Sequence, residues 1–202
     1  LAFPIFAFMI AEGCYYTSNV KKYMLRLFLF AIISEIPFNL IMGSSVFYPF
    51  HQNVLWTFLL GVLSIQIIEK AKKKQKKWIS FFVVCLVLLM DFLLGTITMV
   101  DYNAAGILMV LLFYFFRKKT WISFAAQLVG LYYLNVVMLG NLYYPVTILG
   151  HHFEIAQQSF ALLALIPIWL YHGEQGYHNK WFKYFCYAFY PVHLLILVVI
   201  WQ

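Results

Sequence analysis

Four ionisable residues lie inside long apolar segments of the sequence. They are Glu12, Glu35, Asp91 and His193. At the depth of a membrane such a group costs about 2.5–3.5 kcal/mol or more, so each needs a polar partner or a function. A neutral histidine accepts a proton near pH 7 and a carboxylate can fix its tautomer, which makes His193 with Glu35 or Glu12 a candidate acid–base pair. The alternative is that these groups pair with one another and only join helices.

Two prolines stand beside two of these groups. Pro37 closely follows Glu35, and Pro191 closely precedes His193. A proline within a helix frees a backbone carbonyl, which a membrane tolerates only against protein or a water-filled cavity. We therefore expect Glu35 and His193 to face one polar interior.

The composition is that of a membrane protein. The chain has 202 residues, of which 64% are hydrophobic and 10% charged, and its mean hydropathy is +0.83. A soluble domain is about half apolar and roughly a quarter charged, so a soluble enzyme, a secreted disulfide scaffold and a disordered chain are excluded. Cys14, Cys85 and Cys186 lie in apolar stretches without metal-ligand spacing, so we expect buried thiols and no metal site.

Apolar segments of the length of a membrane span must position the ionisable groups. A helix needs about 20 apolar residues to cross the hydrocarbon. Such segments occupy residues 1–16, 23–42, 53–70, 78–97, 102–116, 121–140, 155–171 and 180–201. Residues 141–154 are apolar but contain Pro145 and Gly150, which indicates an interfacial or re-entrant segment. We expect an all-α integral membrane protein, a polytopic bundle of about eight transmembrane helices, as a single domain over residues 1–202.

The basic residues predict the orientation of these spans. All 14 lysines and arginines lie within four stretches, 21–26, 70–77, 117–119 and 180–183, which belong to every second connection. The positive-inside rule therefore places residues 17–23, 70–77, 117–120 and 172–180 in the cytoplasm, with both chain ends outside. The run at 70–77 is explained by this topology and by attraction to anionic lipid, so we expect no nucleic-acid partner.

Polar residues also gather at the two ends of the expected bundle. On the inner side, Arg26, Gly173, Gly176 and Lys180 offer charges and backbone N–H groups to a phosphate. A tight cytoplasmic turn with a topogenic lysine explains the same residues equally well. The outer side carries His51-Gln52-Asn53, Asp101-Tyr102-Asn103, His151-His152 and Gln157-Gln158.

Several of these motifs are found together in one protein family. They are Ala2-Phe3-Pro4-Ile5-Phe6-Ala7-Phe8, Ala11-Glu12-Gly13, Ser34-Glu35-Ile36-Pro37-Phe38, Gln52-Asn53-Val54, Asp101-Tyr102, Tyr171-His172-Gly173-Glu174-Gln175-Gly176, Lys183-Tyr184-Phe185 and Phe189-Tyr190-Pro191-Val192-His193-Leu194. In this order and over nearly the whole chain, they closely resemble the TraX family.

The resemblance implies a function. The namesake of the family is a conjugation-plasmid membrane protein that acetylates the N-terminus of pilin. The family is also similar to the wider transmembrane acyltransferases, which take an acyl group from cytoplasmic acyl-CoA to an acceptor at or beyond the far face. The resemblance thus implies a multi-pass acetyltransferase of the bacterial cytoplasmic membrane. Its partners would be the lipid bilayer, acetyl-CoA and an acceptor, either pilin or a cell-envelope molecule.

Roles follow for the residues that carry the motifs. The catalytic candidates are His193 as base, Glu35 and Glu12 as its orienting groups, and Asn53, Tyr190 and Tyr102 as hydrogen-bond donors to the developing oxyanion. The candidates for binding acetyl-CoA are Arg26, Tyr171, Gly173, Gly176 and Lys180. Transfer through a covalent acyl-histidine and direct transfer are both open.

The sequence also departs from the family pattern. Relatives usually have Asn where His172 stands, and they carry an earlier helix with an Asp-His pair. The chain opens in mid-hydrophobe without Met, so we expect it to begin partway through a longer protein, after that helix. Two other functions remain as alternatives, a proton-coupled transporter and a non-catalytic membrane scaffold.

Overall fold

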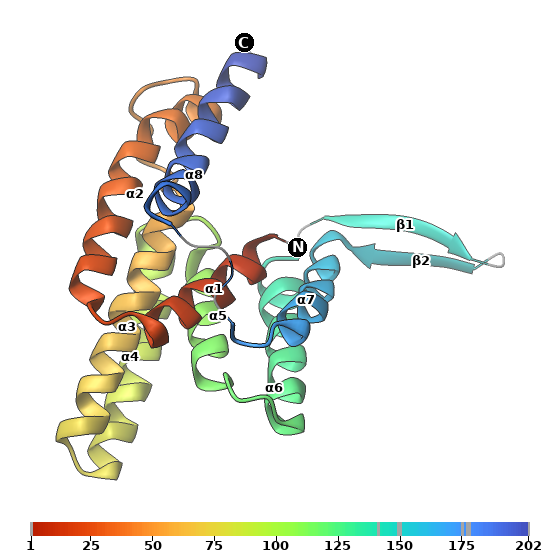
Figure 1. Ribbon diagram of the computed structural model, residues 1–202. Coiled ribbons are helices and arrows are strands. Elements are labelled where there is room, and N and C mark those ends of the chain that lie inside the picture. Colours follow the sequence, from red (N-terminus) through yellow and green to blue (C-terminus); the bar gives the residue numbers. More distant parts are fainter. Residues whose placement is uncertain (1, 141, 149–150, 175, 177–178, 202) are drawn as a thin grey trace.

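A computed structural model describes residues 2–140, 142–148, 151–174, 176 and 179–201, with the backbone alone at 146–148, 151, 153, 180, 183 and 201. Most of the described chain is helical, and Figure 1 shows how the elements are arranged. In chain order they are α1 (Ala2–Tyr16), α2 (Val20–Gly43), α3 (Val54–Lys74), α4 (Lys77–Ile97), α5 (Asn103–Phe115), α6 (Trp121–Tyr132), the π-helical turn η1 (Tyr133–Met138), β1 (Tyr143–Ile148), β2 (His151–Ala156), the 3-10 helix η2 (Gln157–Ala164), α7 (Leu165–Leu170) and α8 (Lys180–Trp201).

The helices match the eight expected segments, but they differ in length. Four are long and apolar enough to cross a membrane, Val20–Gly43, Val54–Lys74, Lys77–Ile97 and Trp121–Met138. The shorter apolar helices are Ala2–Tyr16, Asn103–Phe115, Gln157–Leu170 and Tyr184–Ile200. A helix the length of α5 extends only about 20 Å, against about 30 Å of hydrocarbon. The chain is thus a helical membrane protein, and eight crossings stay a prediction.

Side-chain caps fix where three of the helices begin. The Asn19 side chain accepts the N–H of Lys22 at 3.0 Å, and the Thr120 hydroxyl accepts the N–H of Ser123 at 3.2 Å. Asn53 accepts the N–H of Leu55 at 3.1 Å at the start of α3. Each cap satisfies a backbone donor that has no partner inside the helix.

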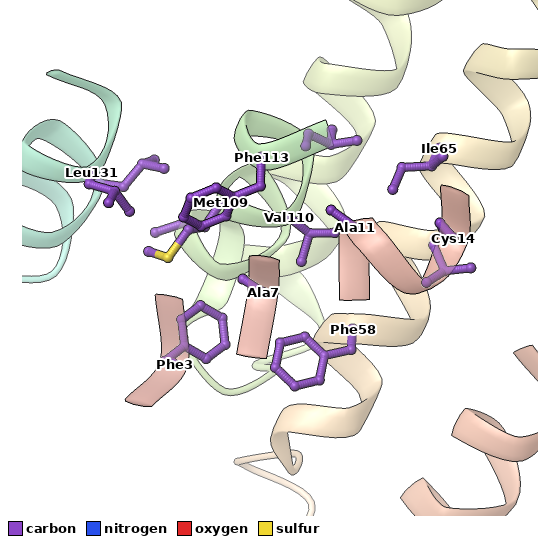
Figure 2. Close-up of a cluster of buried hydrophobic side chains, with 14 of the residues drawn as sticks. Phe3, Ala7, Ala11, Cys14, Phe58, Ile65, Met109, Val110, Phe113 and Leu131 are labelled. Atoms are coloured by element: carbon purple, nitrogen blue, oxygen red, sulfur yellow. The ribbon is translucent and has the colours of Figure 1, made fainter. Parts of the chain in front are cut away.

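The short helix α5 forms the centre of the fold. It packs against α1, α3, α4, α6 and η1, and most of its residues are buried. Figure 2 shows apolar side chains of α5 together with those of α1, α3 and α6, which pack around it. The labelled members are Phe3, Ala7, Ala11 and Cys14 of α1, Phe58 and Ile65 of α3, Met109, Val110 and Phe113 of α5, and Leu131 of α6.

Glycine allows a close contact between α4 and α5. A Cβ atom on Gly95 of α4 would lie 2.6 Å from the backbone N and Cα of Ala104 in α5. Without a side chain at this position the two backbones can approach each other closely, as small residues permit in membrane helices.

The expectation of an all-α protein is wrong at one segment. Within residues 141–156, β1 and β2 form an antiparallel hairpin that projects away from the helices in Figure 1, and an interfacial or re-entrant position of this segment stays a prediction. Tyr143 pairs with Ala156, and Ile148 with His151. The strands are rich in aromatic and β-branched residues, which favour strands. Pro145 is tolerated because each strand of a two-stranded sheet is an edge.

Hydrogen bonds join connections that the charge pattern assigns to the same side. The Gln52 carbonyl accepts the N–H of Asp101 at 2.9 Å, which links two expected outer connections. Lys119 donates to the carbonyl of Trp169 at 2.9 Å and also to that of Tyr171, which links two expected inner connections. These contacts agree with the alternation of sides.

Candidate functional site

A cavity of about 710 Å³ lies between α1, α2, α7 and α8, at the ends that the charge pattern assigns to the cytoplasm. We call it the inner cavity. It is lined by Ile5, Phe8, Met9, Glu12, Gly13, Tyr16, Thr17, Tyr23, Arg26, Pro167, Ile168, Tyr171, Gly173 and Tyr187. The structure therefore brings together three of the residues expected to bind acetyl-CoA, Arg26, Tyr171 and Gly173.

Arg26 is the cation of the inner cavity that has no acidic partner among the described residues. Its Nε donates to the hydroxyl of Tyr187 at 3.0 Å. Its guanidinium carbon lies 5.9 Å from the ring centre of Tyr23 and 5.6 Å from that of Tyr187. Two aromatic rings thus hold the side chain while its charge stays available, a suitable arrangement for binding a phosphate.

The connection after α7 forms one wall of this cavity. Tyr171 ends the helix, and the ammonium of Lys119 holds its carbonyl. Gly173 has a φ of +82°, in the left-handed region that favours glycine. Gly176 does not line the cavity, since no atom lies within 4 Å of the position its Cβ would take. The side chain of Lys180 lies outside the described part of the chain.

A second cavity of about 550 Å³ lies between α1, α2, the start of α3 and α8. We call it the outer cavity. Its polar lining residues are Asp101, Tyr102, Tyr190 and His193. The remainder of the lining is mostly apolar, Ala2, Phe3, Phe6, Met9, Ile10, Tyr23, Leu27, Phe30, Val54, Leu55, Phe58, Cys186, Tyr187 and Phe189.

The two cavities adjoin each other. Met9, Tyr23 and Tyr187 line both of them. These three residues come from α1, α2 and α8, and α8 packs against α2 (Figure 1). A ligand that occupied the inner cavity would therefore meet the outer cavity at these three side chains.

His193 lies on the α8 side of the outer cavity. Its side chain is exposed and its ring stacks on that of Phe189, with the ring centres 5.8 Å apart. Tyr190 lines the same cavity, and its hydroxyl forms a hydrogen bond with the backbone of Val54. His193 and the hydroxyl-bearing side chains of Tyr102 and Tyr190 thus line the same cavity, a combination that suits proton transfer.

Glu35 lies behind this cavity and does not line it. Its Oε2 accepts hydrogen bonds from the Asn53 side chain and, at 3.0 Å, from Trp56 Nε1. Asn53 is fully buried and also donates to the Ala31 carbonyl at 2.9 Å. The buried Oε1 of Glu35 has no partner within the described residues. Two neutral donors therefore hold this carboxylate, and the structure does not bring it into one cavity with His193.

Glu12 lies in the inner cavity, away from the cavity of His193. Its carboxylate forms a two-pronged ion pair with Arg117, with distances of 2.5 Å to Nε and 3.0 Å to Nη2. The guanidinium carbon of Arg117 lies 3.6 Å from the ring centre of Tyr15. This arrangement matches the alternative in which an ionisable group joins helices.

A pair of residues near the outer cavity was not predicted from the sequence. His51 Nε2 and Asp101 Oδ1 are 3.4 Å apart, and Asp101 lines the cavity. Burial raises the pKa of Asp101, and the hydrogen bond and charge of His51 offset part of that rise. Both residues belong to polar clusters at the expected outer end, but their pairing depends on the contact between two distant connections.

Tyr187, which accepts the hydrogen bond of Arg26 and lines both cavities, was also not predicted from the sequence. A tyrosine in an aromatic-rich helix gives no distinct signal.

Asp91, the fourth ionisable residue of the apolar segments, forms a hydrogen bond between two helices. Its Oδ1 accepts the hydroxyl of Ser64 at 2.6 Å, which joins α4 to α3. Neither residue lines the inner or the outer cavity. Within the described ranges, no group of three or more His, Cys, Asp or Glu residues is placed to hold a metal ion.

Comparison with known proteins gives one match. The family model described as TraX protein matches residues 1–201. No curated protein and no solved structure matches the chain. The chain belongs to the TraX family, and this membership, with four helices long and apolar enough to cross a membrane, fits a conjugation-associated membrane protein.

Proposed function

We propose that the protein is a membrane-embedded acyltransferase that transfers acetyl from cytoplasmic acetyl-CoA to an amine or hydroxyl at the membrane. The acceptor is the N-terminus of pilin or a cell-envelope molecule, and the membrane is the inner membrane of a bacterium. The observation that carries this proposal is the pair of adjoining cavities that share Met9, Tyr23 and Tyr187. One cavity has a free cation, and the other has a base.

The inner cavity suits the donor. Its volume of about 710 Å³ lies within the range of roughly 300–1,000 Å³ typical of ligand sites. Arg26 would bind a CoA phosphate, and the backbone at Gly173 would contribute N–H groups. The donor supplies an acetyl thioester, whose pantetheine arm would extend past Tyr23 and Tyr187 toward the outer cavity. Glu12 belongs to this donor side through its ion pair with Arg117.

The outer cavity suits the acceptor. As the acceptor nitrogen or oxygen bonds to the acetyl carbon, the carbon–sulfur bond breaks and CoA leaves as a thiolate. In this direct route His193 would take the proton that the acceptor loses. In the covalent route the His193 ring nitrogen would bond to the acetyl carbon first and displace CoA as a thiolate; the acceptor would then break the acetyl–imidazole bond and leave its proton on the imidazole. The hydroxyls of Tyr190 and Tyr102 would donate hydrogen bonds to the oxyanion. Glu35, held by Asn53, would act on the site through its negative charge near Tyr190.

The base is tested with membranes that contain the complete gene product and acetyl-CoA carrying a labelled acetyl group. His193→Ala should lower the transfer rate at least about 100-fold, since a positioned base contributes roughly 10²–10⁴. Val192→Ala is the matched control, because Val192 lies beside His193 in α8 but does not line the cavity. Unchanged transfer in His193→Ala would exclude this residue as the base.

The donor site is tested by the Michaelis constant for acetyl-CoA. Arg26→Gln should raise it about 10- to 100-fold, the equivalent of one charge-assisted hydrogen bond. Lys22→Gln removes a charge from the same end of α2 without touching the cavity and should leave the constant unchanged. Equal effects of the two variants would contradict a specific role for Arg26.

Two results would favour the other functions. Substrate flux across vesicles without any need for CoA would favour a proton-coupled transporter. Neither CoA binding nor acetyl transfer by the complete protein would favour a non-catalytic scaffold.

A further inference from the structure

A third cavity, of about 630 Å³, lies at the inner ends of α1, α3, α5 and α6. We call it the basic cavity. Its charged lining residues are Glu69, Lys72, Lys73, Arg117 and Lys118. Hydroxyl groups of Tyr15, Thr17, Tyr114, Thr120 and Ser123 line it as well. Four cations thus face one carboxylate in a cavity rich in hydrogen-bond donors.

Two of these cations are already engaged. Arg117 forms the ion pair with Glu12, and Lys72 Nζ lies 3.8 Å from Glu69 Oε1. Lys73 and Lys118 take part in no ion pair among the described residues. The two lysines come from α3 and from the connection after α5, so the fold brings two free charges to one cavity from distant parts of the sequence.

The surface beside the cavity is strongly apolar. Trp121 and Ile122 follow the lining residue Thr120 directly, and their exposures are 87% and 78%. Ser123, the next residue, lines the cavity again. Tryptophan is typical of the level of lipid headgroups, and exposed apolar side chains of a membrane helix face acyl chains. A ligand with an anionic head and an apolar tail matches both surfaces, whereas a small soluble anion would use only the first.

We propose that the basic cavity binds the phosphate headgroup of an anionic phospholipid from the inner leaflet. The phosphate lies between Lys73 and Lys118. The hydroxyls of Thr120 and Ser123 lie 3.0 Å apart, so one donates to the other and the second donates to a phosphate oxygen. The acyl chains lie along Trp121 and Ile122 at the start of α6. This site is separate from the inner and outer cavities and does not depend on the proposed acetyl transfer.

The test measures binding of phosphatidylglycerol and phosphatidylcholine to the delipidated protein in detergent by native mass spectrometry. The unaltered protein should bind phosphatidylglycerol in preference to phosphatidylcholine. Lys73→Gln with Lys118→Gln should weaken phosphatidylglycerol binding about 10- to 30-fold, the effect of two lysines near an anionic headgroup. Lys73→Arg with Lys118→Arg should retain the binding, since arginine also binds phosphate.

The matched control removes two charges outside the cavity. Lys74→Gln with Lys76→Gln changes exposed lysines of the same basic run that do not line it, so phosphatidylglycerol binding should stay unchanged. An equal loss in this control would mean a diffuse charge effect and overturn the site. Equal binding of the two lipids by the unaltered protein would also overturn it.

Soluble phosphates distinguish the source of the ligand. Pyrophosphate and CoA are titrated against the protein loaded with phosphatidylglycerol, with the same variants. If the lysine variants weaken the binding of pyrophosphate or CoA but leave the binding of phosphatidylglycerol unchanged, the cavity binds a soluble phosphate and the proposal is wrong. A lipid that depends on both lysines and resists both competitors supports it.

Discussion

The carboxylates inside the apolar part of the chain have two different kinds of partner. Glu12 is paired with the charge of Arg117, while Glu35 is held by the neutral side chains of Asn53 and Trp56. A buried carboxylate that loses a charged partner becomes an unpaired charge, which is strongly destabilising. The Glu12 pair should therefore matter mainly for stability.

Replacing Arg117 by Gln should lower the free energy of unfolding by up to about 3–5 kcal/mol, because Glu12, at 9% exposure, loses its charged partner. Adding Glu12→Gln should restore much of that loss, since it removes the unpaired charge. Denaturant unfolding in detergent measures both variants. A double variant no more stable than Arg117→Gln would show that the ion pair is not the cause.

Asp101 should make stability depend on pH. Burial raises its pKa, so the folded protein keeps this proton to a higher pH than the unfolded chain does. Its contribution to the free energy of unfolding therefore falls as the pH rises above its usual pKa of about 3.9. Asp101→Asn removes this titration, so the melting temperature of the variant relative to the unaltered protein should rise with pH.

The measurement for Asp101 is a series of melting temperatures in detergent between about pH 3 and 5.5. The asparagine keeps an oxygen that can accept the N–H of Tyr102, as Asp101 does at 3.1 Å, so the turn retains that contact. A difference between the two proteins that is constant across the series would contradict the raised pKa.

At the scale of elements, the position of α5 depends on packing against its neighbours, because the helix is short. The helix is too short to span the hydrocarbon at about 1.5 Å per residue, yet α1, α3, α4 and α6 cover it (Figure 2). Its position therefore depends on close contacts such as that of Gly95 with Ala104.

Gly95→Ala should lower the free energy of unfolding by about 1–3 kcal/mol, as overpacking does. The added methyl group would lie 2.6 Å from the backbone of Ala104, which cannot rotate away as a side chain can. Gly176→Ala is the matched control, since nothing lies within 4 Å of the added atom. Thermal unfolding in detergent compares the two. Equal melting temperatures would mean that α4 and α5 separate without cost.

At the scale of the whole molecule, the connections fall into two groups. The basic stretches belong to one group, and the connections at 43–53 and 98–102 belong to the other. The contacts of Gln52 with Asp101 and of Lys119 with Tyr171 each join two members of one group. This arrangement predicts which connections are reachable from outside the cell.

In a variant whose three cysteines are replaced by alanine, Val46→Cys should react with a membrane-impermeant maleimide in intact cells. Gln75→Cys should react only after the cells are opened, because the positive-inside rule places the basic connection between α3 and α4 in the cytoplasm. Both positions are exposed in the structure, so a difference in labelling reports the side and not burial. The reverse pattern would invert the orientation.

The positions of the helices could be predicted because they depend on local signals. Apolar runs of the length of a membrane span predict the helical segments, and the capping residues Asn19, Asn53 and Thr120 stand at the starts of three helices. The hairpin could not be predicted in the same way. The segment from Tyr143 to Ala156 mixes apolar residues with His151, His152 and Glu154, and its strand-forming residues do not by themselves show that its two halves pair.

The sequence by itself determined the membrane class, the helical segments, the distribution of charge between the two sides and the family. Each of these depends on composition, local runs or motif order. Only the tertiary structure decided which polar residues meet. Arg26 and Tyr187 are 161 residues apart, and Glu12 and Arg117 are 105 apart. A helix that is apolar on all sides has no polar stripe to show which face turns inward, so its partners follow from the packing alone.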